Sequence, residues 1–113
     1  MKSVIIIITL IFSININAQS TITTTTLSVK GNCGECKERI ENAADIKGVK
    51  ICKWDEHTKI ATITFDSKKT DITKIELAIA MAGHETAHHK ADTKAYKGLP
   101  DCCKYEQGDC KKK

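Results

Sequence analysis

The sequence predicts an α+β fold in which two helices cover one face of an antiparallel sheet. Three observations predict it: runs of β-branched residues, two stretches with apolar residues at helical spacing, and glycines or turn residues between them. The chain has 113 residues. This length leaves room for one small domain with a modest core.

Residues 1–18 are predicted to be a signal peptide. Lys2 supplies a short basic region, and residues 4–14 are apolar but too few to span a bilayer as a helix. Cleavage is expected after Ala18, and no cysteine follows the apolar run to carry a lipoprotein anchor. We therefore expect an exported protein, periplasmic in a Gram-negative cell, that is not membrane-anchored after cleavage.

The first half of the remaining chain predicts three strands and a helix. Residues 21–29 are rich in β-branched side chains and form the first strand. A helix follows over 34–44, with apolar residues on one side. Residues 49–54 and 59–65 then predict two strands joined by a hairpin turn.

A second helix and a fourth strand complete the domain. Thr70 or Asp71 can cap a helix over 72–82, and Gly83 ends it as a residue with positive φ would. Residues 85–91 predict a short, polar strand. The order strand, helix, strand, strand, helix, strand predicts a ferredoxin-like sandwich over 19–91, with a four-stranded antiparallel sheet and two helices on one face.

Residues 92–113 form a C-terminal extension beyond this domain. Asp92 can cap a short helix over 93–97, and the segment then carries Cys102, Cys103 and Cys110. We expect the extension to pack on the domain. Two roles stay open for Cys102 and Cys103: an accessory metal site, or a disulfide that leaves one thiol over.

Cys33 and Cys36 form a C-x-x-C pair at the start of the first predicted helix. Such a pair can bind a soft metal ion, close a short disulfide or carry out thiol–disulfide exchange. Thiolates are the soft donors that bind Cu(I), Hg(II) and Zn(II), and a helix N-terminus favours the thiolate. A structural zinc site would need four protein ligands, whereas two ligands in an exposed loop suit transfer of the ion.

Four segments of the chain resemble the heavy-metal-associated domain family, which includes copper chaperones and a periplasmic mercury-binding protein. They are L-S-V-K-G-N-C-G-E-C (27–36), I-E-N-A-A-D-I-K-G-V (40–49), I-T-F-D (63–66) and I-E-L-A-I-A-M-A-G-H (75–84). The resemblance implies that Cys33 and Cys36 bind Cu(I), Zn(II), Hg(II) or Cd(II), and that His84 is a candidate third ligand. The family usually carries Gly-Met-x before the first cysteine, whereas this chain has only Gly31 and Asn32 there.

These observations predict a metal-binding protein, with Cu(I) as the first choice of ion. It would pass the ion by ligand exchange to a transporter or an acceptor metalloprotein, and we expect it to act as a monomer. A net charge of +4 and few aromatic residues give no support to nucleic-acid binding. No general acid–base pair, phosphate loop or activated nucleophile is visible, so we do not expect an enzyme.

Two other functions remain open. The first is a periplasmic thiol–disulfide redox protein that uses the same pair, although the single proline, Pro100, precedes no strand. The second is a structural secreted domain held together by disulfides, because an even number of cysteines in an exported chain favours disulfides. Cys52 lies within a predicted strand and is expected to be a buried thiol.

Overall fold

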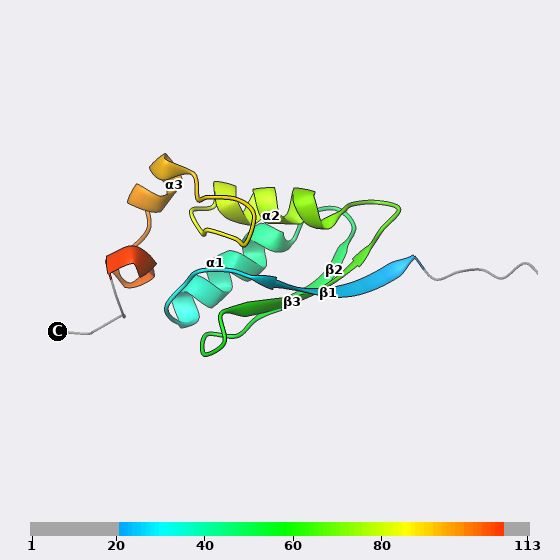
Figure 1. Ribbon diagram of the computed structural model, residues 1–113, viewed down its shortest axis with the longest axis horizontal. Helices are drawn as coiled ribbons and strands as arrows, with labels where there is room; N and C mark the ends of the chain where they lie inside the picture. The colour runs from blue at the N-terminus through cyan, green and yellow to red at the C-terminus, as the bar shows by residue number, and fades with distance from the viewer. Residues whose placement is uncertain (1–20, 108–113) are drawn as a thin grey trace, which may run out of the picture.

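The computed structural model describes residues 21–107 (Figure 1). The predicted signal peptide and Cys110 lie outside the described residues. Three strands form an antiparallel sheet in the order β1-β3-β2: β1 (Ile22–Ser28), β2 (Val49–Trp54) and β3 (Ile60–Asp66). These strands lie within one residue of their predicted bounds or match them.

Both predicted helices are present, and they lie on one side of the sheet (Figure 1). The first, α1, spans Gly34–Ala44, and the second, α2, spans Ile72–Met81. The Asp71 carboxylate caps α2 by accepting a hydrogen bond from the Lys74 backbone N–H at 2.9 Å. Apolar side chains from both helices and the inner sheet face form one core, centred on Ile40, Ile63, Ile75 and Ile79.

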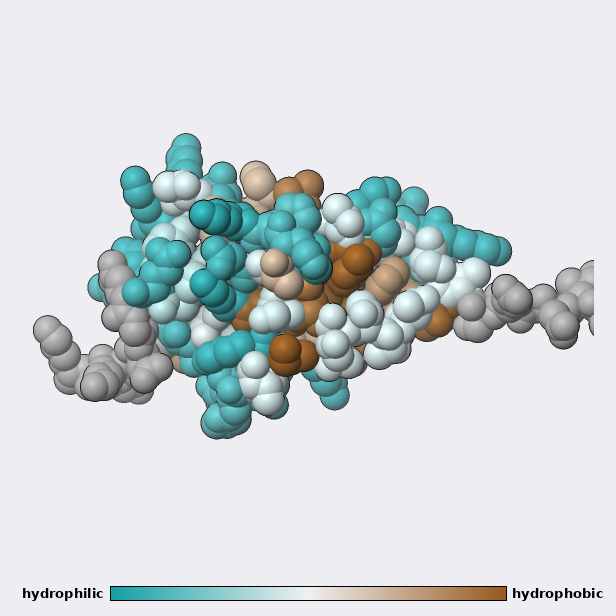
Figure 2. Space-filling view, viewed as in Figure 1, coloured by the Kyte–Doolittle hydropathy of each residue, from teal (hydrophilic) through white to brown (hydrophobic). Residues whose placement is uncertain are grey.

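The predicted fourth strand is wrong. Within residues 21–107 the sheet has three strands, and the segment 85–91 pairs with the chain at the end of β1 by a single isolated bridge, between Val29 and Thr86. The segment turns back on itself, because the Thr86 backbone N–H donates to the His89 carbonyl oxygen at 2.9 Å. Figure 2 shows hydrophobic side chains in the strip between β1 and α2. This strip lies along the edge of β1, with which a fourth strand would have paired.

A buried carboxylate explains this departure from the predicted strand. Glu76, on α2, is only 2% exposed, and its side chain faces the 85–91 segment. His88 Nδ1 lies 2.9 Å from one carboxylate oxygen and His89 Nδ1 lies 3.5 Å from the other. Adjacent residues of a regular strand point to opposite faces, so two neighbouring histidines can reach one carboxylate only from a turn.

Residues 92–107 of the extension pack against the sheet and the helices. The extension begins with the short helix α3 (Thr93–Lys97), capped by Asp92, and continues in two 3-10 turns, η1 (Asp101–Cys103) and η2 (Tyr105–Gln107). Leu99 and Cys103 are buried in the same core as the helices and the sheet. The extension therefore lies over the end of the molecule from which the N-terminus of α1 emerges (Figure 1).

Candidate metal site

The C-x-x-C pair lies at the N-terminus of α1, directly after β1. Cys33 is the N-cap residue, with extended backbone angles and no side-chain capping bond, and Cys36 lies in the first turn. Cys33 is partly exposed, whereas Cys36 is fully buried in the core. One thiol thus faces the surface and the other is fixed by packing. The helix N-terminus places a positive partial charge beside both sulfur atoms.

The loop before the pair rests on the only tryptophan of the chain, Trp54. A Cβ atom on Gly31 would lie 2.9 Å from the Trp54 ring and 3.1 Å from Cys36 Cβ, so no larger residue fits there without movement. The Trp54 indole N–H donates to the Val29 carbonyl oxygen at 2.9 Å. The end of β1 and the start of α1 are therefore packed against one buried ring.

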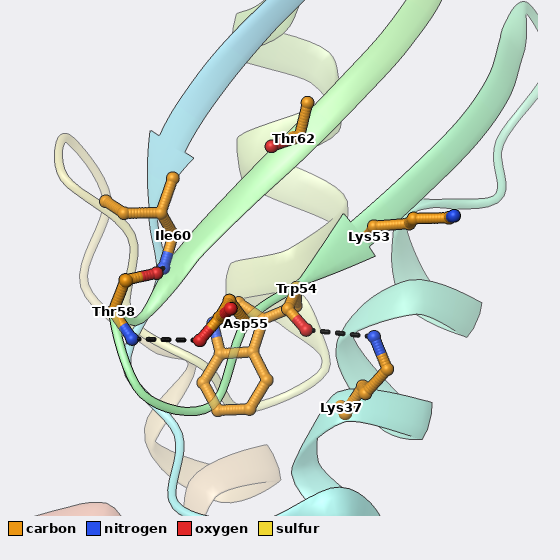
Figure 3. A pocket seen from close by; sticks show the side chains of 7 residues that line it. All are labelled: Lys37, Lys53, Trp54, Asp55, Thr58, Ile60 and Thr62. Carbon is orange, nitrogen blue, oxygen red and sulfur yellow. Dashed lines mark hydrogen bonds between the residues drawn. The ribbon is translucent and has the colours of Figure 1, made fainter.

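Polar contacts join α1 to the end of β2. Lys37 Nζ donates to the Trp54 carbonyl oxygen at 2.9 Å, and the Trp54 backbone N–H donates to Glu41 at 2.9 Å. Figure 3 shows Lys37 reaching toward Trp54 at the side of a shallow surface pocket, with Asp55 and Thr58 of the hairpin turn on the opposite side. Because Lys37 follows Cys36 directly, these bonds fix the helical turn that carries the buried thiol.

The two sulfur atoms of the pair are close enough to bind one ion. Cys33 Sγ and Cys36 Sγ lie 3.8 Å apart, which is far longer than a disulfide bond and places them in non-bonded contact. With metal–sulfur distances of about 2.3 Å, two thiolates on one ion stand roughly 3.8–4.0 Å apart in tetrahedral or trigonal coordination. In linear coordination they would stand about 4.6 Å apart. The observed separation matches the first two geometries.

The extension brings a third thiol to this pair. The sulfur atoms of Cys33, Cys36 and Cys103 all lie within 4.8 Å of one another. A second cluster combines the Cys102 and Cys103 sulfur atoms with the carboxylate of Glu35, again within 4.8 Å. Cys103 belongs to both clusters. Nothing in the sequence indicates that the extension and the pair meet, because no spacing rule relates segments so far apart in the chain.

Cys102 contacts the pair through its backbone. Its carbonyl oxygen lies 3.7 Å from Cys33 Sγ and 4.0 Å from Cys36 Sγ, and accepts a 3.3 Å hydrogen bond from the Asn32 side-chain amide. Its thiol instead donates to Glu35 Oε2 at 2.8 Å. That bond is the main reason why the pKa of Cys102 is raised to about 11. Burial, and then the neighbouring Cys36 thiol, raise the pKa of Cys103 well above its ordinary range.

His84 lies beside the loop but outside both clusters. Its ring is fully buried, with Nδ1 2.8 Å from the Lys30 carbonyl oxygen and Nε2 without a hydrogen-bond partner among the described residues. Its ring centroid is 5.7 Å from that of Tyr105. Burial lowers the pKa of His84, and the charge of Arg39 lowers it further, against the opposing effect of the Lys30 carbonyl.

None of the four histidines belongs to a cluster of ligand atoms in the described part of the chain. His57 is exposed in the hairpin turn, and His88 and His89 contact the Glu76 carboxylate on α2. Cys52 is buried in β2, as predicted, and burial raises its pKa to about 11. Sequence reasoning missed the roles of Asn32 and Glu35, whose contacts with Cys102 depend on the packed extension.

Solved structures share this fold. Oxidised MerP from Ralstonia metallidurans is 34% identical, with a TM-score of 0.55 over 58% of this chain and 94% of MerP. The CopZ metallochaperone is 25% identical, with a TM-score of 0.56 over 57% of this chain and 100% of CopZ. CopA from Bacillus subtilis, 21% identical with a TM-score of 0.51 over 66% and 96%, shows the fold alone. No protein-family model and no curated protein matches the chain.

Each of these structures aligns with two thirds of this chain or less. Across residues 21–107, no helix combines the length and the apolar character needed to cross a membrane.

Proposed function

The chain belongs to the heavy-metal-associated domain family, and on this basis we propose that it captures a soft metal ion with the thiolates of Cys33 and Cys36 and hands it on by ligand exchange. The observation that carries the proposal is the 3.8 Å separation of the two sulfur atoms at the N-terminus of α1. That separation suits two thiolates on one ion. The half-buried position of Cys33 leaves one side of the pair open to an incoming ligand.

Cu(I) is the favoured ion, because it accepts few ligands and prefers sulfur. Hg(II), Zn(II) and Cd(II) are the other ions of the same soft or borderline character. The similarity to the CopZ metallochaperone and to MerP supports a soft ion without choosing among them. His84 is proposed to hold the loop before Cys33 in position, since its Nδ1 contacts the Lys30 carbonyl oxygen.

Export to the periplasm is part of the proposal and rests on residues 1–18 of the sequence. The protein would act there as a monomer and without a membrane anchor. Its partners would be a transporter or an acceptor metalloprotein that offers thiolates of its own, so that metal–sulfur bonds form on the acceptor as they break on this chain. Catalysis and nucleic-acid binding are not part of this function.

Metal titration tests the proposal. The mature chain, reduced without oxygen, is titrated with Cu(I), Zn(II) and Hg(II) against a competing chelator, and the Cys33→Ser/Cys36→Ser variant is titrated beside it. We expect tight binding of one ion, lost in the double variant. Cys52→Ser is the matched control, because it removes a cysteine that lies outside both clusters. Unchanged affinity in the double variant would overturn the proposal.

The same samples separate the two alternative functions. A thiol–disulfide protein would reduce insulin disulfides, and the double variant would lose that activity. A structural secreted domain would show disulfides throughout by mass spectrometry and would take up no metal.

A further inference from the structure

We propose that Cys103 is the third thiolate ligand of the ion held by Cys33 and Cys36, so that the extension completes the metal site from within the same chain. This inference rests on the proposed function, because it concerns the same ion. It goes beyond the proposed function by assigning a third ligand from the C-terminal extension, outside the C-x-x-C pair.

The first argument is the placement of the three sulfur atoms. All of them lie within 4.8 Å of one another, and the Cys33–Cys36 separation is 3.8 Å. Three thiolates around one ion at about 2.3 Å stand roughly 4.0 Å apart at the corners of a triangle. The cluster is therefore close to the size that trigonal coordination requires, and small side-chain rotations suffice to reach it.

The second argument is that Cys103 is held in place by several contacts. Its side chain is fully buried in the core beside Leu99, and its backbone N–H donates to the Pro100 carbonyl oxygen at 2.8 Å. Two residues later, the Tyr105 hydroxyl donates to the Gly83 carbonyl oxygen and accepts from the Glu85 backbone N–H, both at 3.0 Å. The thiol thus reaches the pair from a packed segment.

The third argument concerns Cys102, the neighbouring residue, whose thiol has a different main partner. Its sulfur atom is directed to the Glu35 carboxylate at 2.8 Å and is not in the cluster with Cys33 and Cys36. Its carbonyl oxygen, held by Asn32, lies against both thiols of the pair instead. Asn32, in the loop directly before Cys33, therefore ties the extension to the pair.

Three thiolates change what the site selects and how it releases an ion. Three thiolates suit Cu(I), Hg(II) and Cd(II) in trigonal coordination. They do not increase the affinity for an ion that prefers linear two-coordinate geometry. Transfer then requires an acceptor to displace three protein thiolates in place of two. The extension therefore adds one metal–sulfur bond that must break before the ion leaves this chain.

X-ray absorption on the Cu(I)-loaded mature chain tests this inference by counting the sulfur atoms bound to copper. Samples hold one ion per chain and no added thiol, because a free thiol would supply sulfur itself. We expect three sulfur neighbours in the wild type and in Cys102→Ser and Cys110→Ser, and two in Cys103→Ser. Chelator competition should show a loss of about tenfold or more in Cu(I) affinity for Cys103→Ser alone.

The outcomes separate this inference from the proposed function. Two sulfur neighbours in the wild type, with tight binding abolished by Cys33→Ser/Cys36→Ser, would overturn the inference and leave the proposed function standing. Loss of the third sulfur in Cys102→Ser or Cys110→Ser, in place of Cys103→Ser, would also overturn it. Failure of the wild type to bind any ion would overturn both. Cys103 is buried, so a serine hydroxyl at this position could disturb folding, and Cys103→Ala serves as a second variant. The number of sulfur atoms bound to copper in the wild type tests the inference without any substitution.

Discussion

The Trp54 indole N–H donates a 2.9 Å hydrogen bond to the carbonyl oxygen of Val29. Both residues are fully buried, and the bond joins the end of β2 to the end of β1 directly beneath the loop that carries Cys33. A buried carbonyl oxygen without such a partner would cost roughly 1–3 kcal/mol. The Trp54 ring therefore fixes the position of the loop that carries Cys33 relative to the sheet, and it leaves no room for a side chain at Gly31.

Gly31→Ala should destabilise the protein, because the added Cβ would lie 2.9 Å from the Trp54 ring and 3.1 Å from Cys36 Cβ. Overpacking of this kind costs about 1–3 kcal/mol, and we expect the free energy of unfolding in urea to fall by that amount. Gly34→Ala is the matched control. A Cβ at Gly34 meets no atom within 4 Å, and alanine in a helix should raise stability by about 0.4–1 kcal/mol. Equal effects of the two changes would contradict this account of the loop.

Tyr105→Phe should loosen the extension without removing a metal ligand. The change deletes two hydrogen bonds, to the Gly83 carbonyl oxygen and from the Glu85 backbone N–H. We expect a loss of about 1–3 kcal/mol in the free energy of unfolding and faster hydrogen exchange over residues 99–106. Tyr96→Phe is the control, since its hydroxyl accepts only one exposed bond, from the Glu106 backbone N–H. The prediction fails if Tyr96→Phe speeds exchange in this segment as much as Tyr105→Phe does.

The stability of the reduced, metal-free protein should fall on acidification from pH 7.5 to pH 5.5 because of His84. Burial lowers its pKa in the folded state below the ordinary value of 6.5, so the unfolded chain binds a proton that the folded chain does not. The unfolded state is therefore favoured as the pH drops through the ordinary value, by at most about 1.4 kcal/mol per pH unit. Urea unfolding at several pH values measures the slope.

His84→Asn should flatten that slope, because an amide keeps a polar contact to the Lys30 carbonyl oxygen but does not titrate. His57→Asn, in the exposed hairpin turn, should keep the wild-type slope. A wild-type slope in His84→Asn would show that another group governs the pH dependence in this range.

Cys52 should resist alkylation in the folded, reduced protein. Burial raises its pKa to about 11 from the ordinary 9.0, which reduces its thiolate fraction at pH 8 about 100-fold before any loss of access is considered. Iodoacetamide followed by peptide mass spectrometry should therefore find Cys33 modified long before Cys52, and both modified at similar rates in urea. Equal rates in the folded protein would mean that β2 opens readily or that Cys52 is not buried.

Local sequence patterns predicted most of the fold. Apolar periodicity and the capping residue Asp71 located α2, and alternation along residues 59–65 located β3 within one residue. The prediction of a strand over residues 85–91 was wrong because the pattern there was polar and weak. The contact that decides its structure, between Glu76 and two histidines, joins residues that no local pattern relates. The C-x-x-C pair could be recognised for the opposite reason, since both cysteines lie in one helical turn.

The rest of the site could not be predicted, because it depends on long-range packing of irregular chain. Cys103 reaches the pair through a 3-10 turn that has no periodic signal, and its position is fixed by Leu99 and Tyr105. The sequence showed six cysteines and suggested an accessory site. Only the packed extension shows that one of them, Cys103, shares a cluster with Cys33 and Cys36.

The extension is covalently part of the chain whose thiols it approaches, and this has a consequence for competition. A thiol tethered within 4.8 Å of the pair is present at an effective concentration of millimolar order or higher, however dilute the protein is. A free monothiol in the surroundings must exceed that concentration to take its place. An acceptor that presents two thiols together has the same advantage of tethering. We therefore expect a dithiol acceptor to remove the ion from this site at concentrations at which a small monothiol does not.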